Sequence, residues 1–341
     1  MTTTFPLLRL PYLVLMPVLE QMEFLDRIAF SILSKRTRMY VKLLKMKSKN
    51  VKLKWNGNKI EMIVFCDFTR VLEVDMYINE YQRSTFMNQY KPVYSWRDSS
   101  LLPVDYVLTI MDVMHCKSID KFIIVKISEH DCIPIVAKLP KIDEVVVDHH
   151  WPDVISYEEY IQIERQLLRV LRTVLPVSSA VTISYRFQNH NNLREILKGN
   201  FDAVILKWPD NWITLNDLWI TNSKVLELHK VALNMRDLNR YFKLWTKKIC
   251  NDQLEYMEVR LYDKTSVDLI LDGLNAVPVP IETQREFRMD ITFLFHPPLE
   301  IAVYVFYFDG CTNNLKCLNV CPPQIVQRKH FMIWHVIITI F

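Results

Sequence analysis

The first part of the chain carries two short stripes of apolar side chains with helical spacing. The first stripe follows Leu10-Pro11 and comprises Leu15, Val18, Leu19 and Met22, and the second comprises Leu25, Ile28, Ala29, Ile32 and Leu33. Apolar residues at i, i+3, i+4 and i+7 share one face of an α-helix. A unit of about 40 residues rarely buries enough apolar surface to be stable alone. We therefore expect two helices whose apolar faces pack against the rest of the chain or against a partner.

The next stretch alternates polar and apolar residues with the period of β-strands. Val51–Trp55 and Lys59–Phe65 give a strong hairpin signal with Asn56-Gly57 as the two-residue turn. Arg70–Ile78 continues as a third β-rich run, whereas Asn79–Ser100 is polar and aromatic without a clear period. The pattern predicts a small antiparallel β section followed by a loop.

From Leu101 onward, helical and strand patterns alternate. Predicted helices cover Leu102–Cys116, Tyr157–Leu175, Leu193–Leu197, Leu215–Ile220 and Met235–Lys248, and predicted strands cover Lys121–Ile127, Glu144–His149, Ala180–Phe187, Ala203–Trp208, Lys224–Leu228 and Leu254–Tyr262. Connections of this length favour parallel strands with right-handed crossovers. The recurrence of roughly 20 to 40 residues predicts a leucine-rich-repeat-like βα array, although the strict leucine consensus is missing. A compact doubly wound α/β domain is the alternative.

The amino-acid composition excludes several classes of function. Half of the 341 residues are apolar, so a sizeable core can be buried, and only four residues are glycine. No two glycines are close enough for a phosphate-binding loop, which excludes the Walker, dinucleotide and kinase glycine motifs. The net charge of +4 is too small to argue for nucleic acid. The eleven Lys and Arg residues between Arg27 and Lys59, where no acidic residue occurs, favour a solvated helix face and loop.

The sequence favours a cytoplasmic or nuclear location. The N-terminus lacks the pattern of a secretory signal, and seven cysteines, an odd number, are consistent with reduced thiols. The longest apolar runs, around Ile301–Phe308 and Phe331–Phe341, are shorter than the roughly 20 residues that span a bilayer. We expect no membrane association.

Cysteine and histidine occur together in two regions that could carry chemistry. In the tail, Cys317, Cys321, His330 and His335 have suitable ligand types, but the centre is shorter than the roughly 12 residues of a zinc finger. Earlier in the chain lie His115-Cys116, Cys132 and His149-His150. No general base or orienting residue accompanies them in the sequence. We expect no metal, no cofactor and no catalysis, and we keep a Cys–His hydrolase as an alternative.

The N-terminal pattern resembles an F-box. The resemblance rests on Leu10-Pro11, the Leu15/Val18/Leu19 stripe, the Leu25/Ile28 pair and Leu33-Ser34-Lys35, and with Phe5–Pro11 and Ser31–Arg36 it is similar to the nematode F-box proteins. In two departures, Leu13 stands where an acidic residue is common, and Pro17 lies inside the first helix, where proline costs about 3 kcal/mol or introduces a kink. The resemblance implies binding to a Skp-type adaptor and through it to a cullin. An N-terminal helical hairpin packed on its own domain is the other reading.

A second resemblance covers the βα region. Phe201–Leu206, Trp212–Leu218, Asp237-Leu238-Asn239 with Trp245, and Leu254–Glu258 resemble the F-box-associated domain of nematode F-box proteins. Together the two resemblances imply a constant adaptor-binding head followed by a variable module that binds a target protein. A protein-interaction module outside any ubiquitin ligase is the alternative.

The predicted fold is α+β, with an N-terminal helical F-box, a small antiparallel β section and the βα array. The predicted ranges are 1–48 for the F-box, 49–100 for the connector, 101–310 for the substrate-binding domain and 311–341 for an apolar tail. The predicted adaptor-binding residues are Leu10, Pro11, Leu15, Val18, Leu19, Leu25, Ile28 and Leu33. Because solenoids present the loops after parallel strands on one face, the predicted target-binding residues are Asp148, Trp208, Trp212 and His229.

Overall fold

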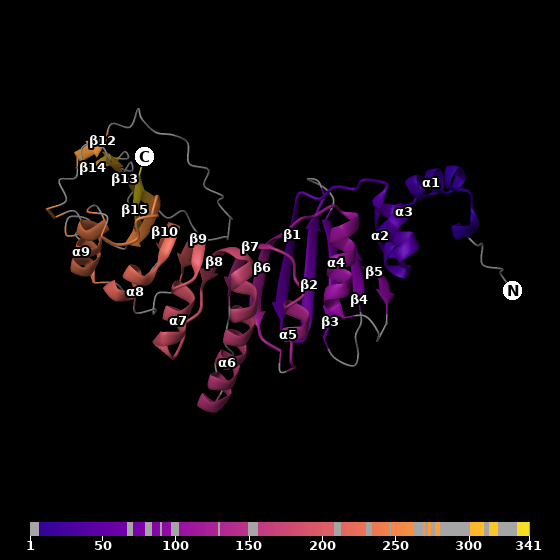
Figure 1. Ribbon diagram of the computed structural model, residues 1–341, viewed down its shortest axis with the longest axis horizontal. Helices are drawn as coiled ribbons and strands as arrows, with labels where there is room; N and C mark the ends of the chain where they lie inside the picture. The colour runs from indigo at the N-terminus through magenta and orange to yellow at the C-terminus, as the bar shows by residue number, and fades with distance from the viewer. Residues whose placement is uncertain are drawn as a thin grey trace, which may run out of the picture. The chain divides into compact units, whose positions relative to one another are not determined.

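The computed structural model describes residues 7–66, 71–78, 84–88, 91–96, 102–128, 130–148, 156–207, 213–229, 234–245, 247, 249–261, 269, 272–273, 277–279, 301–309, 314–319 and 333–340 (Figure 1). These residues form two compact units, 1–178 and 179–341. Each unit is described by itself. Among the described helices, none has the length and apolar character needed to cross a membrane.

Unit 1–178 begins with a helical head. A short 3-10 turn, η1 (Leu7–Arg9), precedes α1 (Tyr12–Gln21), α2 (Phe24–Leu33) and α3 (Lys35–Lys42). Pro17 lies inside α1, in agreement with the helix predicted at this position. Four of the basic residues noted between Arg27 and Lys59 lie in α3, which starts where the Ser34 hydroxyl accepts a hydrogen bond from Thr37 N and the Thr37 hydroxyl accepts one from Ser34 N. This capping box satisfies two amide groups that helix formation would otherwise leave without partners.

The sheet of unit 1–178 joins antiparallel and parallel strands. Its order is β7-β6-β1-β2-β3-β4-β5, and the strands are β1 (Asn50–Asn56), β2 (Lys59–Phe65), β3 (Val71–Tyr77), β4 (Ser84–Asn88), β5 (Lys91–Trp96), β6 (Ile119–Lys126) and β7 (Ile142–Val147). Strands β1 to β5 pair antiparallel, which confirms the antiparallel section predicted up to Ile78. Strand β6 then pairs in parallel with both β1 and β7.

Two details of this section differ from the prediction. The predicted loop at Asn79–Ser100 contains the paired strands β4 and β5, in which Phe86 lies opposite Tyr94. The sequence of this stretch lacks the strict alternation of apolar and polar residues that identifies a strand. The hairpin loop also shifts by one residue, because Asn56 pairs with Lys59 and leaves Gly57 and Asn58 as the loop. Gly57 has φ +63°, the left-handed conformation that glycine adopts most easily.

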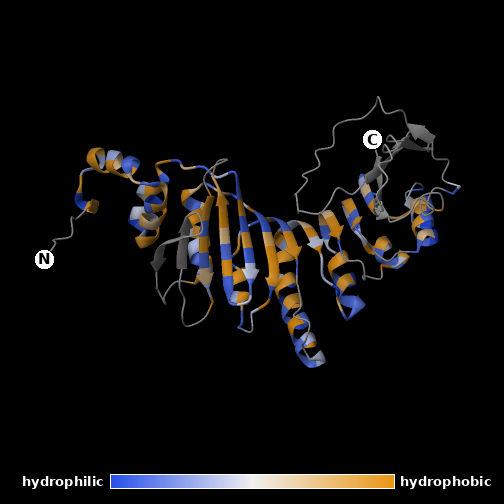
Figure 2. Ribbon diagram, turned by 180° about the vertical axis from the view of Figure 1, so that it is seen from behind, coloured by the Kyte–Doolittle hydropathy of each residue, from blue (hydrophilic) through white to orange (hydrophobic). Residues whose placement is uncertain are grey.

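One face of the unit 1–178 sheet is covered by helices. In Figure 1 α4 (Pro103–Val113), α5 (Ile133–Val136) and α6 (Tyr157–Val174) lie in front of the strands, and the view from behind in Figure 2 shows the strands uncovered. Alternate strand side chains are accordingly buried, Leu53, Met62, Val74 and Phe122 among them. The other face carries ion pairs between neighbouring strands, including Lys59–Asp75 and Lys121–Glu144.

Unit 179–341 also contains both parallel and antiparallel strands. The strand order is β12-β14-β13-β15-β11-β10-β9-β8, and the strands are β8 (Ser178–Ile183), β9 (Asn200–Leu206), β10 (Asn222–His229), β11 (Tyr256–Leu261), β12 (Val277–Val279), β13 (Ile301–Asp309), β14 (Asn314–Asn319) and β15 (Ile333–Ile340). The connecting helices are α7 (His190–Leu197), α8 (Leu215–Ile220) and α9 (Met235–Trp245). Strands β8, β9, β10 and β11 pair in parallel, as predicted.

The fold is α+β, but a leucine-rich-repeat-like array is not confirmed. The described helices range from 4 to 18 residues, whereas stacked repeats require similar units. The apolar end of the chain forms β15, which lies between β11 and β13, so backbone hydrogen bonds on both sides protect it. The predicted domain ranges remain predictions, and the boundary between the two compact units falls within the predicted range 101–310.

Candidate protein-interaction sites

Helix α1 has more exposed apolar side chains than buried ones. Its sequence from Tyr12 to Leu19 contains no polar residue, yet only Leu15 and Leu19 are buried. Leu13 is 83% exposed, and Tyr12, Val14 and Val18 are exposed as well. A helix that is apolar on all sides can cover only one side by packing on its own domain. The remaining side is an apolar surface of the kind that binds a protein partner.

The predicted adaptor-binding residues fall into two groups. Leu15, Leu19 and Ile28 are completely buried, so they belong to the hydrophobic core. The other five are at least partly accessible, namely Leu10, Pro11, Val18, Leu25 and Leu33. Tyr12, Leu13 and Val14 are exposed on the same helix but are absent from the predicted set. An uninterrupted apolar run over two helical turns was the signal that could have identified them.

The head is attached to the rest of unit 1–178 through α4. Helices α2 and α3 pack on each other and on α4. Lys42 Nζ lies 2.5 Å from Asp112 Oδ1, and His115 Nε2 lies 3.2 Å from the backbone oxygen of Lys42. The Ser48 hydroxyl contacts the Cys116 thiol at 2.8 Å. The His115-Cys116 pair therefore lies at a packing contact between the head and α4.

A buried carboxylate organises the helices of unit 179–341. Asp217 is completely buried and accepts hydrogen bonds from Arg194 Nε at 2.7 Å, His190 Nε2 at 2.8 Å, and Thr214 N and Oγ1 at 2.7 and 2.6 Å. Burial alone would raise the pKa of Asp217, but the hydrogen bonds from Thr214, Arg194 and His190 outweigh it and hold the pKa below its ordinary value. Thr214 and Asp217 belong to the segment that resembles the F-box-associated domain, and in this structure they cap α8 and join it to α7.

The structure places two of the four predicted target-binding residues. Asp148 follows β7, is half-buried, and donates its backbone N–H to Ile124 O at 2.9 Å. His229 ends β10 and is only 8% exposed, so it is not the surface residue that we predicted. Strand β10 stays paired with β11 through His229, so this residue lies within the sheet rather than in a loop beyond it. Trp208 and Trp212 lie outside the described residues, whereas Trp245 is buried and Trp219 is exposed.

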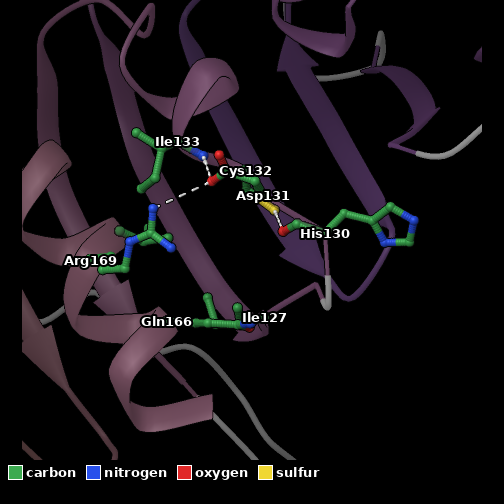
Figure 3. Close-up of a pocket in the computed structure, with 8 residues that line it drawn as sticks. Ile127, His130, Asp131, Cys132, Ile133, Gln166 and Arg169 are labelled. Atoms are coloured by element: carbon green, nitrogen blue, oxygen red, sulfur yellow. Dashed lines mark hydrogen bonds and ion pairs between the residues drawn. The ribbon is translucent and has the colours of Figure 1, made fainter. Parts of the chain in front are cut away.

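A shallow pocket in unit 1–178 contains Cys132 but lacks the arrangement of a nucleophilic site (Figure 3). The cavity of about 140 Å³ lies between the Ile127–Ile133 segment and α6. Burial raises the pKa of the Cys132 thiol to about 11, and the thiol donates to the backbone oxygen of His130 at 3.0 Å. In Figure 3 the His130 ring points away from the Cys132 sulfur. A thiol in this state is a weak nucleophile at neutral pH.

The second cysteine of the Cys–His hypothesis gives the same result. Burial raises the pKa of the Cys116 thiol, although a hydrogen bond with Ser48 opposes that effect. His149 and His150 lie outside the described residues, as do Cys321 and His330 of the tail. Among the described residues, the Cys and His side chains of this region therefore give no positive sign of catalysis.

Comparison with known families identifies two segments of the chain. The F-box domain family matches residues 7–49, which are the helical head. The F-box associated family matches residues 192–259, which run from α7 to β11. No curated protein and no solved structure matches the chain. The chain thus contains an F-box domain and an F-box-associated domain, a combination typical of non-enzymatic substrate-recognition adaptors.

Proposed function

We propose that this protein is the substrate-recognition subunit of a Skp–cullin–F-box type ubiquitin ligase. The head binds a Skp-type adaptor and through it a cullin, and the βα region binds a target protein. The two family matches support this division of labour, because F-box domains bind such adaptors. The chain supplies no catalysis of its own, and its contribution is to bring the target close to the ubiquitin donor.

The exposed apolar side of α1 carries the proposal. It lies within residues 7–49, the segment that matches the F-box family, and its side chains at 12, 13, 14 and 18 are between 38% and 83% exposed. Burying one such side chain against a partner contributes about 1.5–3 kcal/mol. Leu33, which is 64% exposed at the end of α2, is a further exposed apolar side chain of the head. The buried residues Leu15, Leu19 and Ile28 hold these side chains in position.

Asp148, Trp208 and Trp212 are the proposed target-binding residues, because aromatic and charged side chains in loops after strands suit a protein interface. His229 is left out of this set since it is buried.

Co-purification with a Skp-type adaptor tests the proposal. The variant Leu13→Glu places a charge on the most exposed apolar side chain of the head. We expect it to abolish co-purification while the melting temperature stays within about 2 °C of wild type, since exposed substitutions change stability by less than about 0.5 kcal/mol. Ile249→Glu is the matched control, because Ile249 is 64% exposed outside the head. It should retain the adaptor.

Two results would overturn the proposal. If the wild-type chain captures no Skp-type adaptor, the protein acts as an interaction module outside a ligase. If Leu13→Glu and Ile249→Glu both retain the adaptor, the apolar side of α1 is not the docking surface.

A further inference from the structure

Two carboxylates and an imidazole converge on neighbouring parallel strands of unit 179–341. Glu227 of β10 and Glu258 of β11 are paired in register, and His229 lies two residues beyond Glu227. Side chains two residues apart lie on the same face of a strand. His229 Nε2 lies 3.1 Å from Glu227 Oε2 and 3.9 Å from Glu258 Oε1. One ligand atom from each of the three residues lies within 4.8 Å of the other two.

The imidazole nitrogen at the centre of this group lacks a hydrogen bond. His229 is 92% buried, its Nε2 atom is shielded from solvent, and none of the described groups meets it with hydrogen-bond geometry. Glu227 is close enough for an ion pair but is not aligned for a hydrogen bond. Buried polar atoms in native proteins nearly always have a partner, so this nitrogen calls for one. A metal ion placed between the three residues would satisfy it through the ring lone pair.

A neighbouring hydroxyl orients one of the carboxylates. The Tyr256 hydroxyl donates to Glu258 Oε2 at 3.1 Å, so the other oxygen, Oε1, is the one that approaches His229. Hydrogen bonds of this kind orient the carboxylate ligands of metal sites and support their affinity. The hydrogen bond to Oε2 therefore keeps Glu258 Oε1 directed toward His229.

The spacing matches the coordination geometry of zinc. Zinc–nitrogen and zinc–oxygen bonds of about 2.0–2.2 Å place tetrahedral ligand atoms about 3.4 Å apart. The 3.1 and 3.9 Å separations at His229 Nε2 lie on either side of that value. We propose that Glu227, His229 and Glu258 bind a divalent transition-metal ion, with zinc as the best fit to one imidazole and two carboxylates. Three protein ligands leave a fourth position for water or for a donor atom of a bound molecule.

The ion would join β10 to β11 within the segment that matches the F-box associated family. Because ligand atoms come from both strands, metal binding would stabilise the folded form of this region. The inference is independent of adaptor binding by the head.

Titration of the full-length chain with Zn²⁺ tests the site. The protein is first stripped with a chelator and then titrated by calorimetry and in competition with a chromogenic chelator. We expect one high-affinity equivalent of Zn²⁺ and a melting temperature that rises with Zn²⁺. Glu227→Gln and Glu258→Gln should each weaken binding at least tenfold, and Tyr256→Phe should weaken it about tenfold by loosening Glu258. Co²⁺ should give the intense visible absorption of a four-coordinate ion in the wild type but not in the two glutamine variants.

Three controls keep the outcome decisive. His130→Gln removes an exposed histidine and should change nothing, and circular dichroism should show that each variant is folded. Glu227 is only partly buried, so Glu227→Gln keeps the test available if a substitution of His229 prevents folding. The double variant Cys317→Ser/Cys321→Ser should retain the zinc. The proposal is overturned if the wild type binds no zinc, if the glutamine variants bind as tightly as wild type, or if the serine variant loses the ion.

Discussion

Arg194 Nε donates to Asp217 Oδ1 across 2.7 Å, so the guanidinium of α7 neutralises a carboxylate that is completely buried at the start of α8. The Arg194 side chain itself is about one third exposed, which keeps its own desolvation small. The two residues are 23 positions apart in sequence and join two different helices. This contact, rather than the length of α8, explains why a six-residue helix holds its position.

Removing the buried carboxylate should destabilise unit 179–341. Asp217→Ala leaves Arg194, His190 and Thr214 without their acceptor, and breaking a buried pair costs about 3–5 kcal/mol. We expect a loss of about 3 kcal/mol in urea unfolding, together with faster amide exchange in β9 and β10. Asp202→Ala is the control, since Asp202 pairs with Lys224 on the surface and should cost less than about 1 kcal/mol. Equal effects of the two substitutions would contradict this explanation.

The same carboxylate should make stability depend on acid pH. Hydrogen bonds hold the pKa of Asp217 below its ordinary value of about 3.9, so the folded state binds a proton less readily than the unfolded state. The stabilisation is fully present above the unfolded pKa and is lost as pH falls through the folded pKa. Melting temperatures from pH 6 to pH 2.5 should therefore fall more steeply below about pH 4 in wild type than in Asp217→Asn. Parallel curves would show that other carboxylates cause the acid sensitivity.

The buried thiols should resist alkylation in the native chain. Burial raises the pKa of Cys132 and of Cys250 to about 11, so almost no thiolate is present at pH 7.5. We expect iodoacetamide to modify both residues slowly in buffer and rapidly in urea, as measured by peptide mass spectrometry. Alkylation of native Cys132 faster than that of free cysteine would revive the Cys–His hydrolase hypothesis.

Apolar burial, more than the ion pair, should hold the head on α4. Ile28 and Val41 are completely buried, whereas the side chains of Lys42 and Asp112 are both exposed. Asp112→Ala should therefore cost less than about 1 kcal/mol. Ile28→Ala should cost about 2–5 kcal/mol because it leaves a cavity. Urea unfolding of the full-length chain measures both, and a larger effect at Asp112 would reverse the ranking.

The local patterns were the reliable part of the sequence prediction. The stripe from Leu25 to Leu33 and the hairpin around Gly57 depend on neighbours in sequence, and both are present. Parallel pairing of β8 to β11 followed from the length of the connections. The pairing of β1 with β6 was not predictable, because the hydrophobic pattern of a strand does not say which distant strand will lie beside it.

The residues of the candidate sites were predicted less well than the secondary structure. Whether a side chain is available for binding depends on its burial, which the local sequence does not show. Leu15, Leu19 and Leu13 are equivalent by hydropathy, yet the first two are buried and the third is exposed. His229 was expected on a rim, but the addition of β11 beside β10 places it in the interior. Thr214 and Asp217 do form a recognisable capping box in the sequence. Its further partners His190 and Arg194 come from another helix, and no local pattern indicates them.

The parallel pairing of β1 with β6 has a consequence for how the chain folds during synthesis. Lys52 pairs with Lys121, so the ribosome must release about 70 further residues before β1 can complete its hydrogen bonds. Helices α2 and α3 likewise wait for α4 before they can bury their inner faces. The nascent N-terminal region therefore stays incomplete over several seconds of translation, since ribosomes add about 5–20 residues per second. A fragment that ends at Lys49 would lack both β6 and α4. An adaptor that binds the head during translation would therefore bind it before these two elements have been synthesised.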